Sequence, residues 1–203
     1  MAKAPRSRKA RRSRVRRCTR ETSVAVRLDL DGTGRARIRT GIGFFDHMLE
    51  LLGRHALWNL ELSGRGDRQV DDHHLVEDAG IVLGRALAEA LGDKKGASRY
   101  GWARVPMDEA LAEAALDLSG RAYLHLEGLP ARGRSGTFEF ALAEEFLRAL
   151  ADNARMTLHL TVLRGRNAHH LLESAFKALG RALRQAAAVD PREPGVPSTK
   201  GRL

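Results

Sequence analysis

Apolar residues recur at helical spacing in separate segments of the chain. Stripes of this kind predict helices near 44–55, 73–91 and 169–187. The first stripe includes Phe45 and Leu49, and Gly92 follows the second stripe as a helix stop. Each of these helices has one apolar face, so each must pack that face against another element.

The third stripe repeats the second. Residues 73–87, HHLVEDAGIVLGRAL, and residues 169–183, HHLLESAFKALGRAL, are identical at ten of fifteen positions. The match extends backwards from WNLEL at 58–62 to MTLHL at 156–160, and from FFDHMLELL at 44–52 to LAEEFLRAL at 142–150. With only two copies, the chain is a duplication and not a solenoid.

Strands are predicted before each first helix. VAVRLDLDGTGRARIRT at 24–40 is similar to LAEAALDLSGRAYLHLE at 111–127, and both alternate and turn at a glycine, as a β-hairpin does. Each half therefore predicts hairpin, helix, strand, helix. We expect an α+β fold of two duplicated two-layer α/β halves, with the helices on one face of each sheet.

Composition shifts give the expected organisation of the chain. It comprises a basic N-terminal extension at 1–18, a first repeat at 19–92, a linker at 93–104, a second repeat at 105–190 and a C-terminal tail at 191–203. The first twenty residues contain ten Lys or Arg and no acid, which equals the net charge of +10 for all 203 residues. The rest sums to zero, which excludes a basic face over the whole protein.

The basic extension is expected to be solvated and disordered, with a transit peptide or a nucleic-acid-binding arm as alternatives. The single cysteine, Cys18, excludes an internal disulfide and fits a reducing compartment. No apolar run reaches the roughly 18–20 residues that a membrane helix requires. A cytoplasmic protein without a membrane partner is the simplest interpretation.

Each repeat begins its second helix with His-His-x-x-Glu. Positions three or four residues apart share a helix face, whereas neighbours point about 100° apart. His74 can therefore join Glu77 on one metal while His73 serves another, and His170 with Glu173 and His169 repeat the pattern. A lone histidine on a helix is usually structural, but two copies of this pair favour metal ligands.

Pseudo-symmetry predicts two metal sites. One comprises His47, His74, Glu77 and His169, and the other comprises His73, Glu145, His170 and Glu173. Glu145 is the repeat equivalent of His47, and Glu144 competes with it for that role. Imidazole and carboxylate donors without thiolate suit manganese, iron or zinc. Asp71 and Asp72 precede the first pair, and capping of the helix is expected for at least one of them.

Several motifs in order give a family resemblance. They are FFDHML, DDHHLVED, PMDEAL, LDLSGRAYL, GRNAHHLLESAFKALGRAL and PSTKG. With these motifs the sequence resembles imidazoleglycerol-phosphate dehydratase, a lyase of histidine biosynthesis, over about residues 19–203. The resemblance implies a ribosomal-protein-like fold in each half, with helices on one side of a four-stranded sheet. It also implies two Mn²⁺ per active site and a homo-oligomer of 24 subunits that share active sites.

The resemblance also implies roles for individual residues. Metal ligands are implied at His47, His73, His74, Glu77, Glu145, His169, His170 and Glu173. Contacts to the substrate phosphate are implied at Arg99, Arg121, Lys177, Ser198, Thr199 and Lys200, the last three within the C-terminal tail. Glu21 matches a substrate-contacting acid near the glycerol hydroxyls. Glu21 and Glu173 are the candidates for general acid–base catalysis.

The implied reaction converts D-erythro-imidazole-glycerol phosphate to imidazole-acetol phosphate with loss of water. The C2 hydrogen is not acidic, but an imidazole ring bound to two metals becomes imidazolate-like. Such a ring can expel the C3 hydroxyl and leave a diazafulvene intermediate, whose C2 proton is easier to remove. Two similar metal sites fit the two ring nitrogens.

Three other functions compete with this hypothesis. Another dimetal enzyme, a hydrolase of phosphorylated small molecules, would release phosphate instead of a ketone. A nucleic-acid-binding protein would act through the basic extension, although the neutral remainder of the chain makes a specific nucleic-acid partner unexpected. A metal-binding scaffold without catalysis would not need phosphate contacts such as Arg99 and Arg121.

Overall fold

A computed structural model describes residues 10–203 of the chain. The first half contains β1 (Arg12–Cys18), β2 (Thr22–Asp29), β3 (Ala36–Arg39), α1 (Gly43–Ala56), β4 (Asn59–Gly66) and α2 (His73–Leu91). The second half contains β5 (Tyr100–Met107), β6 (Ala110–Asp117), β7 (Tyr123–Glu127), β8 (Arg134–Ser135), β9 (Phe138–Glu139), α3 (Leu142–Ala154), β10 (Thr157–Arg164) and α4 (Ala168–Ala187). The order of elements thus repeats, apart from the short β8–β9 hairpin before α3.

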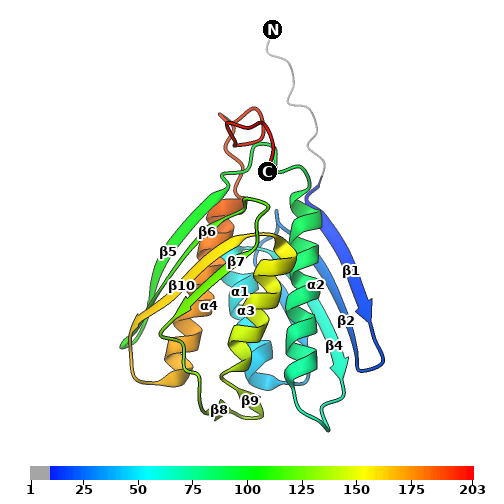
Figure 1. Cartoon of the computed structure of the whole chain (residues 1–203), viewed down its shortest axis with the longest axis vertical. Helices are drawn as coiled ribbons and strands as arrows, with labels where there is room; N and C mark the ends of the chain where they lie inside the picture. The colour runs from blue at the N-terminus through cyan, green and yellow to red at the C-terminus, as the bar shows by residue number, and fades with distance from the viewer. Residues whose placement is uncertain (1–9) are drawn as a thin grey trace.

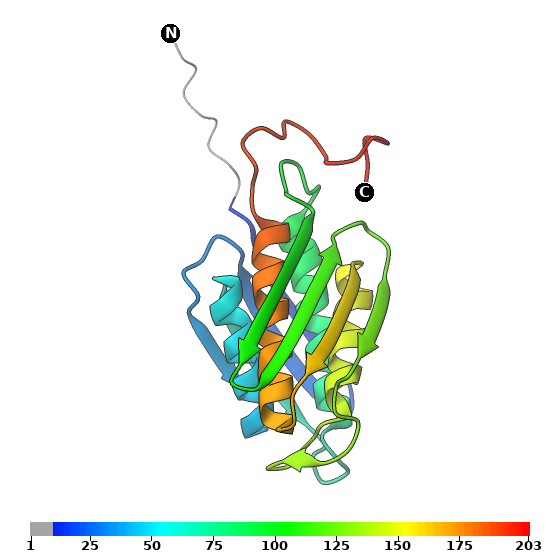
Figure 2. The same ribbon diagram turned by 90° about the vertical axis from the view of Figure 1, so that its left-hand side faces the viewer.

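Each half forms a four-stranded mixed sheet, in the orders β1-β2-β4-β3 and β5-β6-β10-β7. The two sheets form the outer walls of the molecule and the helices fill the space between them (Figure 1). Figure 2 looks onto the second sheet and shows helices behind it. The prediction of two α/β halves, each a four-stranded sheet with two helices on one face, is confirmed.

One continuous core joins the halves. Helix α2 packs on α3, and α1 packs on α4, so every helix contacts both its own sheet and a helix of the other half. The large buried side chains include Phe45 and Trp58 from the first half and Phe146 and Phe176 from the second. The apolar stripes that the duplication repeats therefore face one another across the middle of the molecule.

The hairpins expected at 24–40 and 111–127 are wrong. Strand β4 lies between β2 and β3, and β10 lies between β6 and β7. β3 and β7 pair in parallel with these central strands. The glycine segments are not tight reversals, because each connects two strands that a central strand, β4 or β10, separates in the sheet. The tight antiparallel pairs are β1–β2 and β5–β6.

The basic run is not an extension throughout. Arg12–Cys18 form the edge strand β1, so the expected disorder of 1–18 is wrong for these residues, while residues 1–9 lie outside the described part. Val15 faces the core and the arginines on either side of it point outward. The same correction applies to the linker expected at 93–104, because β5 begins at Tyr100.

The two helices that carry the histidine pairs, α2 and α4, begin at similar caps. The backbone N–H of His73 donates to Asp71 Oδ1 at 2.8 Å, and the backbone N–H of His169 donates to Asn167 Oδ1 at 2.9 Å. Capping therefore falls to Asp71, whereas Asp72 is buried and accepts a hydrogen bond from Arg68 Nε.

Among the described residues, none of the helices has the length and apolar character that crossing a bilayer demands.

Candidate active site

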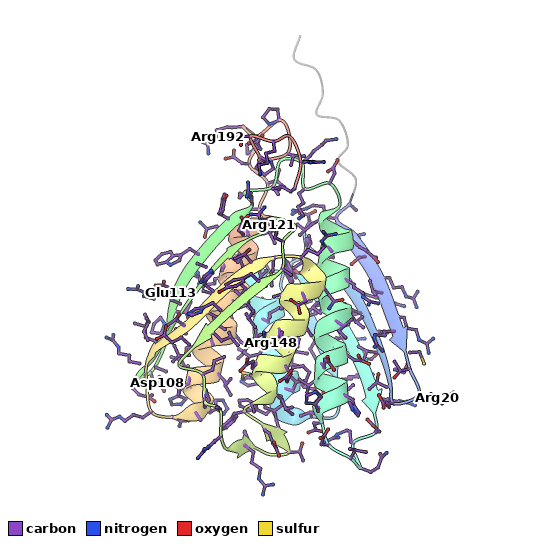
Figure 3. All side chains as sticks on the ribbon, viewed as in Figure 1. Arg20, Asp108, Glu113, Arg121, Arg148 and Arg192 are labelled. Carbon is purple, nitrogen blue, oxygen red and sulfur yellow. The ribbon has the colours of Figure 1, made fainter. Side chains whose placement is uncertain are left out.

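The two histidine pairs lie at the same end of the molecule. His73 and His74 begin α2, and His169 and His170 occupy the first turn of α4. Both helices run in the same sense between the sheets, so both first turns lie at the lower end in Figure 1. The turns β1–β2 and β5–β6 reach this end too, where Figure 3 labels Arg20 and Asp108.

The crossing of α1 and α4 creates a three-residue cluster. His169 Nε2 lies 3.2 Å and His47 Nε2 lies 3.9 Å from Glu173 Oε2, and the two imidazole rings are 5.9 Å apart. One donor atom from each residue lies within 4.8 Å of the others, which is suitable for a single metal ion. The edge of the His169 ring also packs on Phe44, which fixes its plane.

Lys177 controls the charge of Glu173. Its Nζ lies 2.7 Å from Glu173 Oε1, one helical turn along α4. Burial alone would raise the pKa of the Glu173 carboxyl, but the hydrogen bond and charge of Lys177, with His47 and His169, keep this pKa below its usual value. Glu173 is therefore an anion that can bind a cation through its second oxygen.

The crossing of α2 and α3 forms the repeat equivalent of this cluster. His73 and Glu145 line one cavity of about 410 Å³, together with Asp72 and residues of the β8–β9 hairpin. Within the described residues, Asp72 Oδ2 is the buried side-chain polar atom that has no hydrogen-bond partner. An unpaired buried carboxylate oxygen is costly unless a cation or water satisfies it.

The second histidine of the first pair contacts two acids. His74 Nδ1 lies 3.1 Å from Asp67 Oδ2 and 4.0 Å from Glu21 Oε2. The Asp67 hydrogen bond raises the pKa of His74, although partial desolvation opposes it. These three residues form the second group whose donor atoms lie within 4.8 Å of one another.

The second histidine of the other pair has a similar partner. His170 Nδ1 lies 2.8 Å from Glu109 Oε2, and its Nε2 lies 3.8 Å from Asp108. Glu109 also accepts the backbone N–H groups of Asn167 and Arg166, and with His170 they hold the pKa of Glu109 at about 2. The Glu109 bond in turn raises the pKa of His170.

Glu21 and Glu109 occupy equivalent positions. Glu21 directly precedes β2, and Glu109 directly precedes β6, so each ends the turn of its half's first hairpin. Each turn brings its glutamate to the second histidine of the following helix pair. The two glutamates differ in their contacts, because Glu109 accepts backbone N–H groups whereas the Glu21 side chain remains 57% exposed.

The structure groups the expected ligands differently from the sequence. His47 lies beside His169 as expected, but Glu173 joins them instead of Glu77, and His74 lies apart beside Asp67. Glu77 has intermediate exposure on α2 and forms no contact comparable to that of Glu173 within the described residues. Asp67 and Glu109 were missed, although Glu109 lies in the PMDEAL motif at the position that corresponds to Glu21.

The expected phosphate contacts divide between the two ends of the molecule. Lys177 lies at the histidine end, beside Glu173. Arg99 instead binds Asp117 at 2.7 Å and donates to the Pro197 carbonyl, which joins it to the C-terminal tail. Arg121 is 70% exposed, 3.8 Å from Asp117, and Figure 3 shows it far from Asp108, toward the tail.

These two ends cannot act on one small molecule within a single chain. The backbone N–H of Arg99 donates to the Ala186 carbonyl near the end of α4, whereas Glu173 is in its second turn. At about 1.5 Å per residue, the thirteen residues between Glu173 and Ala186 cover roughly 20 Å. Ser198, Thr199 and Lys200 belong to the tail end, where the backbone N–H of Lys200 donates to Ser198 Oγ.

The donor set at the histidine end fits divalent metal ions. It combines imidazoles and carboxylates without thiolate, a set typical of manganese, iron or zinc. The unpaired Asp72 oxygen and the anionic Glu173 provide negative charge at the two helix crossings. Fold and site thus define a duplicated α/β protein with imidazole–carboxylate clusters at one end that are candidate metal sites.

Comparisons with known proteins identify the family. The family model for imidazoleglycerol-phosphate dehydratase matches residues 40–183. The chain is 54% identical to the imidazoleglycerol-phosphate dehydratase of Desulforamulus reducens over 95% of this chain and 98% of the relative. It is 55% identical to that of Moorella thermoacetica, over 96% and 99%. The chain belongs to the imidazoleglycerol-phosphate dehydratase family, which is a family of hydro-lyases.

Two solved structures share the fold. The imidazoleglycerol-phosphate dehydratase of Staphylococcus aureus is 40% identical, with a TM-score of 0.78, over 87% of this chain and 98% of that one. The enzyme of Pyrococcus furiosus, solved in complex with (S)-C348, is 37% identical, with a TM-score of 0.80, over 93% and 100%. The resemblance inferred from the motifs is confirmed, and it includes the strand that the basic run forms.

Proposed function

We propose that this chain dehydrates D-erythro-imidazole-glycerol phosphate to imidazole-acetol phosphate in the cytoplasm. The observation that carries the proposal is the pair of imidazole–carboxylate clusters, His47/His169/Glu173 and Glu21/Asp67/His74, at one end of a chain of this family. Two divalent ions, which we take to be Mn²⁺, would lower the pKa of the substrate imidazole and orient the ring. Family membership supports the substrate, and the donor set supports the metals.

The ligands that we propose include both histidine pairs. His47, His169 and Glu173 are the first set that one chain brings together, and His73 with Glu145 is its equivalent at the other crossing. His74 and His170 each use Nδ1 toward a carboxylate, which leaves Nε2 as a ligand. Glu77 remains a proposed ligand through its position one turn after the first pair.

We assign proton transfer to Glu21. Elimination removes the C2 proton and the C3 hydroxyl, which leaves as water after accepting a proton, and the resulting enol becomes the ketone. Glu21 can move a proton because it is exposed and free of the backbone bonds that hold Glu109. Glu173 is tied to Lys177 and the histidines, so its main role is charge and metal binding.

Phosphate recognition falls to the tail end of another subunit. A three-carbon chain is far too short to join the histidine end to Arg99 within one chain. We propose that Arg99, Arg121, Ser198, Thr199 and Lys200 of one chain meet the metal ligands of a neighbour in a homo-oligomer, which the resemblance gives as 24 subunits. Arg121 is free to form the planar, bidentate contact that phosphate favours.

The decisive experiment measures products. Purified protein is incubated with imidazole-glycerol phosphate, and both ketone and inorganic phosphate are quantified with Mn²⁺ and after removal of metal by a chelator. We expect one ketone per substrate consumed, no phosphate, and loss of turnover without metal. Phosphate release without ketone would support a dimetal hydrolase and contradict the proposal. Lack of both products in metal-loaded protein would contradict it equally.

A further inference from the structure

A buried polar cluster that belongs to neither candidate metal cluster lies between α2 and the first hairpin. Asp78 of α2 is 6% exposed, and its Oδ2 accepts hydrogen bonds from the Thr22 hydroxyl and, at 3.2 Å, from Arg17 Nη1. Thr22 is the first residue of β2 and is 4% exposed, while Arg17 of β1 supplies the opposite charge. A carboxylate is costly to bury even when it is paired, so its presence here indicates a role beyond packing.

The described chain has no counterpart of this cluster in its second half. Ser174 occupies the position of Asp78, and its hydroxyl donates to the Leu171 carbonyl of its own helix at 2.9 Å. Ala110, the first residue of β6, occupies the position of Thr22. Alanine has no hydroxyl, so α4 cannot form the same bond to the start of β6. The polar link therefore distinguishes the first half from the second.

The link continues from Thr22 into the turn that contains Glu21. The Thr22 hydrogen is donated to the carboxylate of α2, so Thr22 Oγ1 accepts from the Thr19 hydroxyl at 3.2 Å. Thr19 Oγ1 in turn accepts the backbone N–H groups of Glu21 and Thr22 at 3.1 and 2.9 Å. A chain of hydrogen bonds thus runs from α2 to the backbone of Glu21, and none of these bonds uses the Glu21 carboxylate.

The two halves hold their equivalent glutamates in different ways. The Glu109 carboxylate itself accepts two backbone N–H groups, those of Asn167 and the residue before it, and so ties its turn to the start of α4. Glu21 is held by its backbone instead, through Thr22 and Asp78. Its side chain is therefore placed without being consumed by the contacts that place it.

We propose that Asp78 is a positioning residue for Glu21, which acts through the hydroxyl of Thr22. His74 and Asp78 are four residues apart and share one face of α2, the first beside the Glu21 carboxylate and the second beside the start of its strand. One helix thus places both the imidazole and the glutamate. The inference rests on the dehydration proposed above, in which Glu21 transfers a proton, and a misplacement of about 1 Å can lower such a rate by about 100-fold.

Two variants of Thr22 separate its hydroxyl from its packing. Thr22→Val keeps the branched shape and removes the donor, whereas Thr22→Ser keeps the donor and loses a buried methyl group. With saturating Mn²⁺, we expect Thr22→Val to lower kcat by about 10–100-fold with little change in KM, and Thr22→Ser to keep the wild-type kcat. A role in packing alone predicts the reverse order, because serine leaves the larger void. That reverse order would overturn the proposal.

The route through Glu21 is tested by combining Thr22→Val with Glu21→Gln. If Thr22 acts by placing the Glu21 carboxylate, its hydroxyl has no value once that carboxylate is an amide. We therefore expect Thr22→Val to lower kcat in the wild-type background and to leave the residual kcat of Glu21→Gln unchanged. Equal losses in both backgrounds overturn the proposal, and so does a wild-type kcat in Thr22→Val.

Asp78→Asn tests the helix end of the link. The amide keeps the size of the side chain but not its charge, so its bond to the Thr22 hydroxyl is weaker and kcat should decrease in the same background-dependent way. Ser174→Ala is the matched control, since this buried hydroxyl bonds within its own helix, and its kcat should equal that of the wild type. A loss in Ser174→Ala as large as that in Asp78→Asn overturns the proposal.

Two measurements do not depend on turnover. Mn²⁺ titration should give Thr22→Val the wild-type affinity, because His74 keeps its bond to Asp67; a loss of affinity that matches the loss of kcat would assign Thr22 to the metal site and overturn the proposal. Hydrogen exchange followed by mass spectrometry should be faster at residues 19–22 in Thr22→Val than in Thr22→Ser, and equal exchange overturns the proposal. Wild-type protein that forms no ketone contradicts the dehydration instead, whatever the exchange shows.

Discussion

Two carboxylates determine which ring nitrogen of His74 and of His170 is available to bind a metal ion. Asp67 and Glu109 both contact Nδ1, the nitrogen nearer the backbone. A neutral imidazole that donates a hydrogen bond from Nδ1 has a free lone pair on Nε2 for a metal ion. The carboxylate that accepts from Nδ1 makes Nε2 a stronger ligand. The two acids thus act as positioning residues, through geometry that spacing in the sequence does not encode.

Glu109→Gln should weaken metal binding. An amide loses the negative charge that fixes the His170 tautomer, so we expect the affinity for Mn²⁺ to fall by about 10–100-fold. Titration of free Mn²⁺ by electron paramagnetic resonance measures this without turnover. The control is Asp108→Asn, which removes the same charge from the neighbouring residue at 3.8 Å from Nε2. Equal losses in both variants would reduce the role of Glu109 to general electrostatics.

Metal affinity should depend on pH near neutrality. The pKa values of His74 and His170 are both raised in the metal-free protein, so these rings keep their protons to higher pH than a free imidazole. A proton must leave before a metal binds, so affinity should decrease on acidification, and the decrease should begin above pH ~6.5. Mn²⁺ titrations between pH 6 and 8 test this, and a constant affinity over that range would contradict the proposed ligands.

The histidines could be predicted from the sequence, but their partners could not. A repeated His-His-x-x-Glu pattern is visible because each copy lies within one continuous helix, α2 or α4. Asp67 and Glu109 come from loops and turns, and their approach to His74 and His170 depends on how the strands are ordered. That order was wrong in the prediction, which paired the strands of 24–40 and of 111–127 as hairpins, whereas β4 and β10 lie between those strands.

Helix spacing holds the histidine clusters together. A methyl group on Gly180 of α4 would lie 2.8 Å from the Leu52 carbonyl oxygen and 3.0 Å from His55 Cβ on α1. Gly84 of α2 is its repeat equivalent, and there the same group would lie 2.7 Å from the Leu150 carbonyl oxygen on α3. Both crossings therefore need backbone contact, which brings His47 to His169 and Glu145 to His73.

Gly180→Ala should destabilise the protein although alanine favours helices. The added methyl group must push α1 away from α4, and overpacking of this kind costs about 1–3 kcal/mol. Urea unfolding followed by circular dichroism measures the change in the free energy of unfolding. Gly43→Ala is the control, since no atom lies within 4 Å of the added group. A Gly180→Ala protein as stable as the control would show that the crossing is not tight.

Helices were easier to predict than strands for a physical reason. Helix periodicity is local, and the segments 73–91 and 169–187 were placed within a residue of their observed ends. Strand β1 has one buried apolar residue, Val15, among arginines, so its alternation is hidden by charge. Parallel pairing of β3 and β7 with the central strands is a long-range choice that the local glycine turns do not reveal.

At the scale of the whole molecule, the duplication predicted two similar halves but not how they face. The observed arrangement places all four histidines of the two pairs, at the starts of α2 and α4, at one end of the molecule. Arg99 and the tail lie at the other end. Pseudo-symmetry in the sequence suggested two metal sites, and the resemblance implied active sites that subunits share. Glu173 and Arg99 lie near opposite ends of α4, and the shared site that we propose rests on this separation.

Subunit complementation should follow from this division. His169→Ala removes a proposed metal ligand, and Arg99→Ala removes a proposed phosphate contact, so each variant alone should be inactive. When equal amounts are unfolded together and reassembled, about a quarter of the shared sites should combine an intact histidine end with an intact tail end. Activity in the mixture should therefore recover to about a quarter of the wild-type value.

The comparison that decides is His169→Ala mixed with Glu173→Gln. These residues lie in one cluster of one chain, 3.2 Å apart, so every site that they form is damaged and no recovery is expected. Reassembly of wild-type protein by the same procedure measures the yield against which both mixtures are scaled. If the His169/Arg99 mixture stays as inactive as this control, the tail end of one chain does not complete the histidine end of another, and the proposed shared site is wrong.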